Sequence, residues 1–363
     1  MLLKPTSRIW TLVLASCIFL GTIYLWSEGN LSQSGLFPSP QSTPGAGNAT
    51  LGFGAIYVLT EDVSTWRVQS LLQAAKLAGL RIEVPVQEKP SDEAVRAQVG
   101  GEPEEGYGHA RALLNHLALL DKIAQSPHET ALIMEDDVDF GLQIRSQMEL
   151  VSKAFWDHAN LAPESRGSAE EVLHPYREHE WDIFWPGHFG MSFIEGSDVF
   201  KYHDPHALPW DRLTTQFNNY YEQMAAGSSK QAEPQQLIFN VAPLATFAYA
   251  ITKAHAARLV QKFRQDKTHK FDNAVHIDCV GRVHRCVAPV PQLFHHHQVV
   301  GEKASSSEGK QDESVAVQDL KWYRTRHRYT YNIEWSARCN AAGVGEKLGE
   351  KWQCLPGKYD PMM

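Results

Sequence analysis

The segment ALIMEDDVDF, residues 131–140, places four apolar side chains directly before a cluster of acidic ones. An unbroken apolar run that ends abruptly in polar residues is typical of a buried strand in a mostly parallel sheet. In open α/β sheets, ligands bind at the carboxyl ends of the strands, and the acidic side chains follow that end directly. The segment therefore predicts an α/β fold with a functional edge at the end of this strand.

The acidic cluster has the composition of a metal site. Carboxylates crowded together repel one another, so they favour a hard divalent cation such as Mg²⁺ or Mn²⁺. A cation held there could also bind a diphosphate. The alternative is a solvated acidic loop after a strand, because a short motif without structural context is only a hypothesis. The acidic residues are Glu135, Asp136, Asp137 and Asp139.

Near the N-terminus, residues 9–26 form an uncharged apolar segment. As a helix it would extend about 27 Å, close to the hydrocarbon thickness of a bilayer. Lys4 and Arg8 precede the segment and Glu28 follows it, which predicts a cytoplasmic tail, residues 1–8, and a lumenal remainder. The alternative is a cleaved signal peptide, which usually has a shorter apolar region and a small-residue cleavage site. We expect a single-pass type II membrane anchor.

The next segment, residues 27–50, is rich in Ser, Gly, Pro, Gln and Asn and has few side chains to bury. Such a composition predicts a flexible stem. The segment carries two N-glycosylation acceptors, Asn30 and Asn48, if it is lumenal. Residues 51–300 then form the expected globular domain, a length that single α/β domains reach.

The cysteines fit the same compartment. One of the five lies inside the apolar segment, and the other four would face an oxidising lumen as an even set. Local pairs Cys279–Cys286 and Cys339–Cys354 are plausible, although all three connectivities remain open. No CxxC spacing suggests a zinc site.

The C-terminal part divides in two. Residues 301–317 combine consecutive serines with mixed charges and are expected to be a disordered loop, whereas residues 318–363 are an aromatic and basic extension. In a lumenal protein such an extension favours a packed lid or an acceptor surface. The net charge of −8, with no long basic tract after the apolar segment, argues against nucleic acid as a partner.

The domain opens with a strand–helix–strand pattern. Residues 55–60 predict a strand, residues 66–78 have the apolar spacing of a helix that ends at Gly79, and residues 81–86 predict a second strand. This is the opening of a nucleotide-binding α/β sheet. The chain lacks a GxGxxG or P-loop motif at this point, so neither a dinucleotide-binding fold nor a kinase is indicated.

Later segments extend the same pattern. Residues 106–125 have helical periodicity, with His109 and His116 on the apolar face. These histidines could serve a site, but hydrogen-bonded core histidines are more common in such a stripe. Residues 181–190 and 244–252 predict further buried strands, the second followed by a helix.

Three consecutive histidines end the strand-like segment PQLFHHHQ, residues 291–298. Adjacent side chains on an extended chain point to opposite faces, so at most two of them can converge on one site. We expect a surface position or a contact with a diphosphate rather than a structural metal site.

The order of these motifs resembles glycosyltransferase family 25, particularly its fungal-type members and, more distantly, the collagen and lipopolysaccharide galactosyltransferases. The resemblance covers residues 53–298. Leu59-Thr60 stands where the family usually has Asn-Leu, and an Asn-His pair where it more often has Ser-His. The matching segments are IYVLT with the helix that carries Arg67, Asn115-His116, ALIMEDDV, WDIFWPG, FAYAITKAHAARLV, His276-Ile277-Asp278 and PQLFHHH.

This resemblance implies a GT-A fold, a Rossmann-like sheet in one globular unit. It also implies that the acidic motif acts like the Asp-x-Asp of that fold, with Glu135 and Asp137 in the outer positions and Asp139 supporting the metal. Bound Mn²⁺, or Mg²⁺, would bind the donor diphosphate and stabilise charge on the departing nucleoside diphosphate. The residues expected to contact the nucleotide-sugar donor are Arg67, His116 and Asp136.

Family members are regarded as inverting, so the resemblance implies a base that deprotonates the acceptor hydroxyl. Asp278 is the first candidate and His276 the second, both near an expected loop within residues 271–289. The alternative is that Asp278 caps a helix or a turn.

The expected function is that of a metal-dependent hexosyltransferase anchored in the Golgi or ER membrane. It would move a sugar from a nucleotide-sugar donor to a glycan or protein hydroxyl, and the resemblance alone indicates galactose from UDP-galactose. One alternative is a membrane-tethered glycan-binding protein without catalysis. Another is a metal-dependent hydrolase built on the carboxylates and histidines, which the lack of an HExxH motif disfavours.

Overall fold

The computed structural model describes residues 45–103, 107–159, 168–207, 235–266, 270–297, 333 and 335–341, which all belong to one unit of the chain, Ser42–Met363. The expected membrane anchor, most of the expected stem, residues 301–317 and most of the C-terminal extension lie outside them. Among the helices that the structure describes, none is both long and apolar enough to cross a bilayer.

The end of the expected stem belongs to the folded unit. Residues 45–50 form turns in which Ala46 and Thr50 are buried. The Asn48 side-chain oxygen accepts hydrogen bonds from the backbone N–H groups of Thr50 and Gly52, at 2.8 and 2.9 Å. The prediction of a flexible stem is therefore wrong for these residues, because side-chain hydrogen bonds can order a short polar turn.

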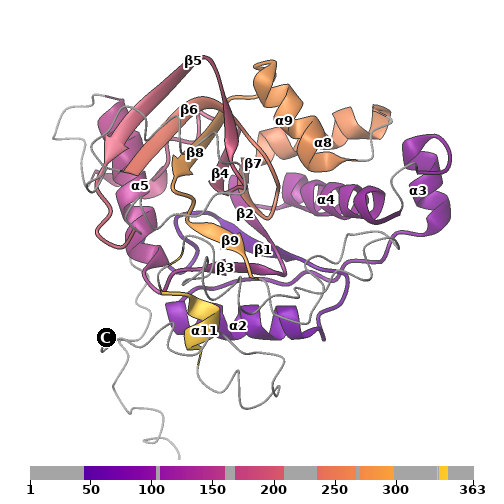
Figure 1. Cartoon of the computed structure of the whole chain (residues 1–363), viewed down its shortest axis with the longest axis horizontal. Coiled ribbons are helices and arrows are strands. Elements are labelled where there is room, and N and C mark those ends of the chain that lie inside the picture. Colours follow the sequence, from indigo (N-terminus) through magenta and orange to yellow (C-terminus); the bar gives the residue numbers. More distant parts are fainter. Residues whose placement is uncertain are drawn as a thin grey trace, which may run out of the picture. The chain divides into compact units, whose positions relative to one another are not determined.

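The strands form one sheet. In chain order they are β1 (Ala55–Leu59), β2 (Thr130–Glu135), β3 (Val138–Phe140), β4 (Ile183–Gly187), β5 (Met191–Tyr202), β6 (Gln235–Pro243), β7 (Ala248–Thr252), β8 (Cys286–Val290) and β9 (Phe294–His296). Seven of the nine strands lie in the order β1-β2-β7-β4-β8-β6-β5, and β9, off this path, pairs with both β3 and β4 (Figure 1). The predicted α/β class is confirmed.

The sheet is mixed, so the prediction of a mostly parallel sheet is wrong. β1 pairs with β2, and β4 with β8 and β9, in parallel, whereas the other five pairings are antiparallel. β7 lies antiparallel between β2 and β4. The apolar run of β2 does not distinguish these cases, because a strand covered on both faces is apolar throughout whatever the direction of its neighbours.

Helices cover both faces of the sheet. The described helices are α2 (Trp66–Ala78), α3 (Asp92–Val99), α4 (Tyr107–Gln125), α5 (Ile144–His158), α6 (Ala169–Leu173), α8 (Lys253–Gln265), α9 (Phe271–Val280) and α11 (Ala337–Asn340). Successive strand residues point to opposite faces, so Leu132 and Met134 pack with α2 and α5, whereas Ala131 and Ile133 pack with α4, α8 and α9 (Figure 1). β2 is thus buried on both faces.

Local sequence signals set the helix ends. The Thr65 hydroxyl caps the start of α2 by accepting from the N–H of Val68, and Gly79 ends the helix in a left-handed conformation with a φ of 69°. Thr252 caps α8 in the same way through the N–H of His255. The predicted helix over residues 66–78 is confirmed at both ends.

Two other local predictions change. The predicted strand at 81–86 forms only an isolated parallel bridge, between Glu83 and Tyr57. Residues 271–280, expected near a loop, form α9.

The disulfide Cys279–Cys286, one of the two suggested pairs, joins the end of α9 to the start of β8. The other suggested pair includes a cysteine at position 354, outside the described residues.

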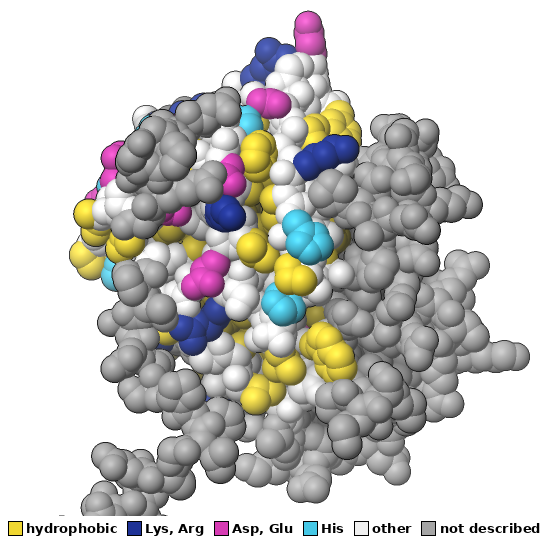
Figure 2. Space-filling model, turned by 90° about the vertical axis from the view of Figure 1, so that its left-hand side faces the viewer, with side chains coloured by type: hydrophobic (Ala, Val, Ile, Leu, Met, Phe, Trp, Pro, Cys, Tyr) yellow, Lys and Arg dark blue, Asp and Glu magenta, His cyan; other side chains and the backbone are white. Residues whose placement is uncertain are grey.

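On the side of the molecule drawn in Figure 2, the coloured acidic, basic and histidine side chains are interspersed, with hydrophobic side chains between them. The described surface on this side therefore presents no field of a single sign. A functional site on this side would therefore be a local cluster of side chains rather than a large charged surface.

Candidate metal site at the carboxyl edge of the sheet

The acidic residues lie where β2 ends and the chain turns into β3. Asp136 and Asp137 form this turn, and β3 then pairs antiparallel with β9 in a register that places Val138 opposite His296. β4 ends at Gly187, where an added Cβ would lie 2.7 Å from the Cβ of Ala248. Glycine there allows β4, β7 and β9 to pack closely at this edge.

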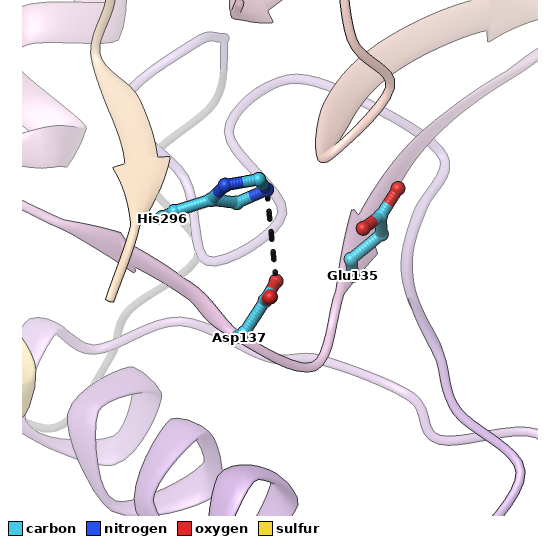
Figure 3. Close-up of side chains that lie close together, drawn as sticks. All are labelled: Glu135, Asp137 and His296. Carbon is cyan, nitrogen blue, oxygen red and sulfur yellow. Dashed lines mark ion pairs between the residues drawn. The ribbon is translucent and has the colours of Figure 1, made fainter. Parts of the chain in front are cut away.

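Glu135, Asp137 and His296 converge at this turn. One potential ligand atom of each lies within 4.8 Å of the others. Asp137 points toward His296, which projects from β9, while Glu135 projects from the end of β2 beside them (Figure 3). The distance from Asp137 Oδ1 to His296 Nε2 is 3.9 Å. Two carboxylates and an imidazole form a ligand set that suits a divalent transition metal such as Mn²⁺.

The hydrogen bonding of Asp137 fits this interpretation. Its Oδ1 atom is buried and accepts no hydrogen bond from any described residue. A buried carboxylate oxygen without a donor is unfavourable, and a bound cation would satisfy it. His296 is itself held between the rings of Phe189 and Phe247, with centroids 4.7 and 4.3 Å away. The ligand set is therefore already assembled by the fold.

His116 supports Glu135 from the core. Its Nε2 lies 3.6 Å from Glu135 Oε1, its Nδ1 lies 3.0 Å from the Tyr249 hydroxyl, and its ring stacks on Phe271. The Thr246 hydroxyl also donates to Glu135, at 3.3 Å. Burial alone would raise the pKa of Glu135, but the interactions with His116 outweigh it and lower the pKa. His116 thus has the hydrogen-bonded core position that the sequence left as the alternative to donor binding.

Arg67 and Asp136, both predicted to contact the donor, lie together. Arg67 Nη1 is 3.8 Å from Asp136 Oδ1, and the Thr60 hydroxyl donates to Asp136 Oδ2 at 2.8 Å. Burial and the neighbouring Asp137 raise the pKa of Asp136 to about 6, against the opposing effect of Arg67. Thr60 was not expected to contribute. Its place at the end of β1, the parallel neighbour of β2, is the signal that could have identified it.

Asp139, predicted as a metal-site residue, lies outside the triad. It is fully buried, it accepts from the Ser336 hydroxyl, and it also accepts from the backbone N–H of Arg338 at 3.2 Å. Its carboxylate lies 3.6 Å from His297 Nδ1, and burial is outweighed by this contact, so that its pKa is lowered. Asp139 is thus joined by hydrogen bonds to residues of the C-terminal segment, and the third side chain that approaches Glu135 and Asp137 is His296, which was not among the metal-site residues expected from the sequence.

The histidine triplet follows the alternation expected of a strand. His296 faces Asp137, whereas His295 and His297 are buried. The expected surface position is therefore wrong, because β9 is an interior strand paired with β3 and β4. The register that brings His296 to the acidic turn depends on residues about 150 positions apart and could not be predicted from local pattern.

Asp278 and His276, the candidate bases, are separated by the geometry of α9. Residues two apart on a helix point to nearly opposite sides. Asp278 Oδ2 lies 3.2 Å from both Lys262 Nζ and His284 Nε2, and His276 Nδ1 lies 3.0 Å from the carbonyl oxygen of Pro243. The structure does not bring either residue into the triad.

The opposite edge of the sheet carries a second charged cluster. Asp182 precedes β4 and accepts hydrogen bonds from the backbone N–H and guanidinium of Arg285 and, at 3.0 Å, from Arg258. Burial would raise the pKa of Asp182, but the hydrogen bonds from Arg285 outweigh it and hold the pKa at about 2. A pocket of about 310 Å³ lies beside this cluster and is lined partly by Arg177 and Glu180. Its position at the amino ends of β4 and β8 separates it from the triad.

Comparison with known proteins identifies no family for this chain, because no family model matches it and no curated protein is significantly similar to it.

Proposed function

We propose that this protein is a metal-dependent glycosyltransferase of the GT-A type. The observation that carries the proposal is the convergence of Glu135, Asp137 and His296 at the carboxyl edge of the sheet, with one buried Asp137 oxygen lacking a hydrogen bond from the described residues. The order of motifs shared with glycosyltransferase family 25 supports UDP-galactose as donor. The apolar segment at residues 9–26 supports anchorage in the Golgi or ER membrane.

The proposed reaction breaks the bond between the sugar C1 and the diphosphate oxygen and forms a bond between C1 and an acceptor hydroxyl oxygen. The acceptor proton passes to a base, and the nucleoside diphosphate departs. Mn²⁺, when bound, supplies a Lewis acid to the diphosphate. Glu135, Asp137 and His296 would hold that ion, and the contact with His116, which lowers the pKa of Glu135 against the effect of burial, favours its anionic form. Arg67, at the same edge, adds a positive charge beside the diphosphate.

The test is a screen of the full chain against UDP-sugars, with and without Mn²⁺, in which release of UDP is measured. We expect turnover with one UDP-sugar that requires Mn²⁺ and that is lost in Glu135→Gln. Glu88→Gln is the matched control, since the Glu88 side chain is exposed and is not one of the three residues that converge at the turn. Turnover that is independent of Mn²⁺, or equal in Glu135→Gln and Glu88→Gln, would overturn the proposal.

A metal-dependent hydrolase is the second candidate, and the entry of His296 into the acidic site favours it. Two carboxylates and one histidine around a divalent ion can also activate water. This alternative predicts hydrolysis of a glycoside or phosphoester in Mn²⁺ without any sugar donor. The screen separates the two functions, because only the transferase needs a nucleotide sugar.

A further inference from the structure

Arg338 connects the C-terminal segment to the acidic turn. It lies in α11 and is 1% exposed. Its Nε donates to the carbonyl of Val138 at 2.6 Å, and its Nη2 donates to the carbonyl of Asp136. Its Nη1 donates to the Arg67 carbonyl at 2.9 Å and to the Ser70 hydroxyl at 2.8 Å. One buried guanidinium therefore joins the acidic turn to α2.

These bonds enclose the backbone of Asp137. The carbonyls of the residues before and after it, Asp136 and Val138, both accept from Arg338. The carbonyl of Asp137 itself accepts from the backbone N–H of His297, next to His296, at 2.6 Å. Two of the three triad residues are thus fixed relative to each other by α11 on one side and β9 on the other.

Two arginines also offset part of the negative charge at the acidic turn. Four carboxylates lie at or beside the turn, those of Glu135, Asp136, Asp137 and Asp139, and the guanidinium groups of Arg67 and Arg338 contact this region. The formal charge is −4 + 2 = −2, which one divalent cation neutralises. Without Arg338 the turn would lose the donor that fixes its backbone. The greater repulsion among the carboxylates would by itself favour a cation, so the expected loss of affinity comes from the lost hydrogen bonds.

We infer that Arg338 is a positioning residue for the proposed metal site, and that residues 335–341 act as a clasp on the acidic turn. This inference deepens the proposed function and rests on it. Groups that orient metal ligands typically change metal affinity 10–100-fold when they are removed. The affinity of the acidic site for Mn²⁺ therefore depends on a residue about 200 positions away in the chain.

The clasp has attachments besides Arg338. The N–H of Leu142 donates to the carbonyl of Trp335 at 2.8 Å, and Ser336 forms an antiparallel bridge with Gly141. The Ser336 hydroxyl donates to Asp139. These bonds remain when Arg338 is replaced, so we expect the segment to stay docked in an Arg338 variant and the fold to survive.

The experiment is a titration of the full chain with MnCl₂, with and without UDP, in which the electron paramagnetic resonance signal reports free Mn²⁺. Arg338→Met should bind Mn²⁺ about 10–100-fold more weakly than the wild type. Arg338→Lys should be intermediate, because an ammonium can keep some of the hydrogen bonds to the turn but cannot reach all the acceptors of the planar guanidinium. Arg264→Met is the matched control, since Arg264 is exposed and pairs with Asp121 across the surface.

Affinity measured on protein shown to be folded by circular dichroism separates positioning from stability. Equal Mn²⁺ affinity in folded Arg338→Met and the wild type would overturn the inference. If Arg338→Met does not fold, Ser336→Ala decides. Its affinity should fall several-fold, and an unchanged value would overturn the clasp. If the wild type binds no Mn²⁺ in either condition, the proposed metal site itself fails, and the clasp fails with it.

Discussion

The two edges of the sheet use buried carboxylates in opposite ways. At the amino edge, Asp182 is saturated by hydrogen bonds from Arg258 and Arg285, and its pKa is held at about 2. At the carboxyl edge, Asp137 keeps a buried oxygen to which no described residue donates, and its neighbour Asp136 has a pKa raised to about 6. A satisfied carboxylate stabilises the fold, whereas the unsatisfied oxygen of Asp137 is one that the proposed cation would complete.

The largest expected effect is the loss of activity on changing the carboxyl edge. In Asp137→Asn, the amide cannot replace a carboxylate as an anionic metal ligand, so Mn²⁺-dependent release of UDP should fall on the order of 100-fold or more. Stability should not fall, because the substitution removes repulsion with Asp136. Steady-state kinetics and urea unfolding check both statements. Full activity in Asp137→Asn would contradict the proposal that the carboxylate at the carboxyl edge serves activity rather than stability.

The same substitution at the amino edge should have the reverse result. Asp182→Asn weakens charge-assisted hydrogen bonds to Arg258 and Arg285 and should lower the free energy of unfolding by about 1–3 kcal/mol. Mn²⁺ affinity should stay at the wild-type value, because Asp182 lies at the other end of β4. Urea unfolding and a Mn²⁺ titration test this. A weakened metal site in Asp182→Asn would show that the edges are coupled.

The contributions of Asp182 and Asp136 to the free energy of unfolding should change with pH in opposite directions. The pKa of Asp182 is lowered from 3.8 to about 2, so its contribution to stability is present above pH 4 and is lost as the pH falls toward 2. The pKa of Asp136 is raised from 3.8 to about 6, so its contribution is greatest below pH 4 and is lost as the pH rises through 6. Unfolding of metal-free wild type, Asp182→Asn and Asp136→Asn across pH 2–7 should show these windows. Parallel curves for all three proteins would contradict the assignment.

Replacing one arginine at each edge should have a smaller effect, and it should differ between the two edges. Arg67→Met removes the cation beside Asp136 and should raise the KM for the UDP-sugar about tenfold, because the proposed charge-assisted contact with the diphosphate would be lost. Arg258→Met removes a cation of the same type from Asp182 and should leave KM unchanged. Equal KM values in both variants would mean that Arg67 serves the fold alone.

The smallest expected effect concerns the support of Glu135. Tyr249→Phe removes the hydroxyl that lies 3.0 Å from His116 Nδ1, and the loss of this buried hydrogen bond should cost about 0.5–1.5 kcal/mol of stability. Mn²⁺ affinity should fall only a few-fold, because His116 remains stacked on Phe271. Calorimetry and the Mn²⁺ titration measure the two changes. A greater effect on affinity than Asp137→Asn produces would place His116 rather than Asp137 at the centre of the site.

The sequence predicted those features that depend on neighbouring residues. The buried strand β2, the acidic turn after it and the helix α2 that ends before Gly79 follow from short-range pattern, and the structure has each of them. The pairing Cys279–Cys286 is one of the possibilities that the sequence left open. The acidic cluster that contains Glu135 and Asp137 was predicted for the same reason, because it directly follows an apolar run, whereas the choice of these two residues within it came from the resemblance to glycosyltransferase family 25.

Features that depend on distant residues were not predicted. β7 lies antiparallel between β2 and β4, but the apolar sequences of β2 and β4 resemble those of strands with parallel neighbours. The sheet was therefore expected to be mostly parallel. The approach of His296, rather than Asp139, to Glu135 and Asp137 depends on the register of β3 with β9. Arg338 belongs to a basic extension whose composition indicates charge but not which carbonyls its guanidinium will meet.

The most direct test is a crystal of the protein grown with MnCl₂ and measured at a wavelength where manganese scatters anomalously. The account predicts one strong anomalous peak within coordination distance of Glu135, Asp137 and His296, and no such peak beside Asp182. A peak that lies only elsewhere, or no peak beside these three side chains at saturating Mn²⁺, would contradict the account.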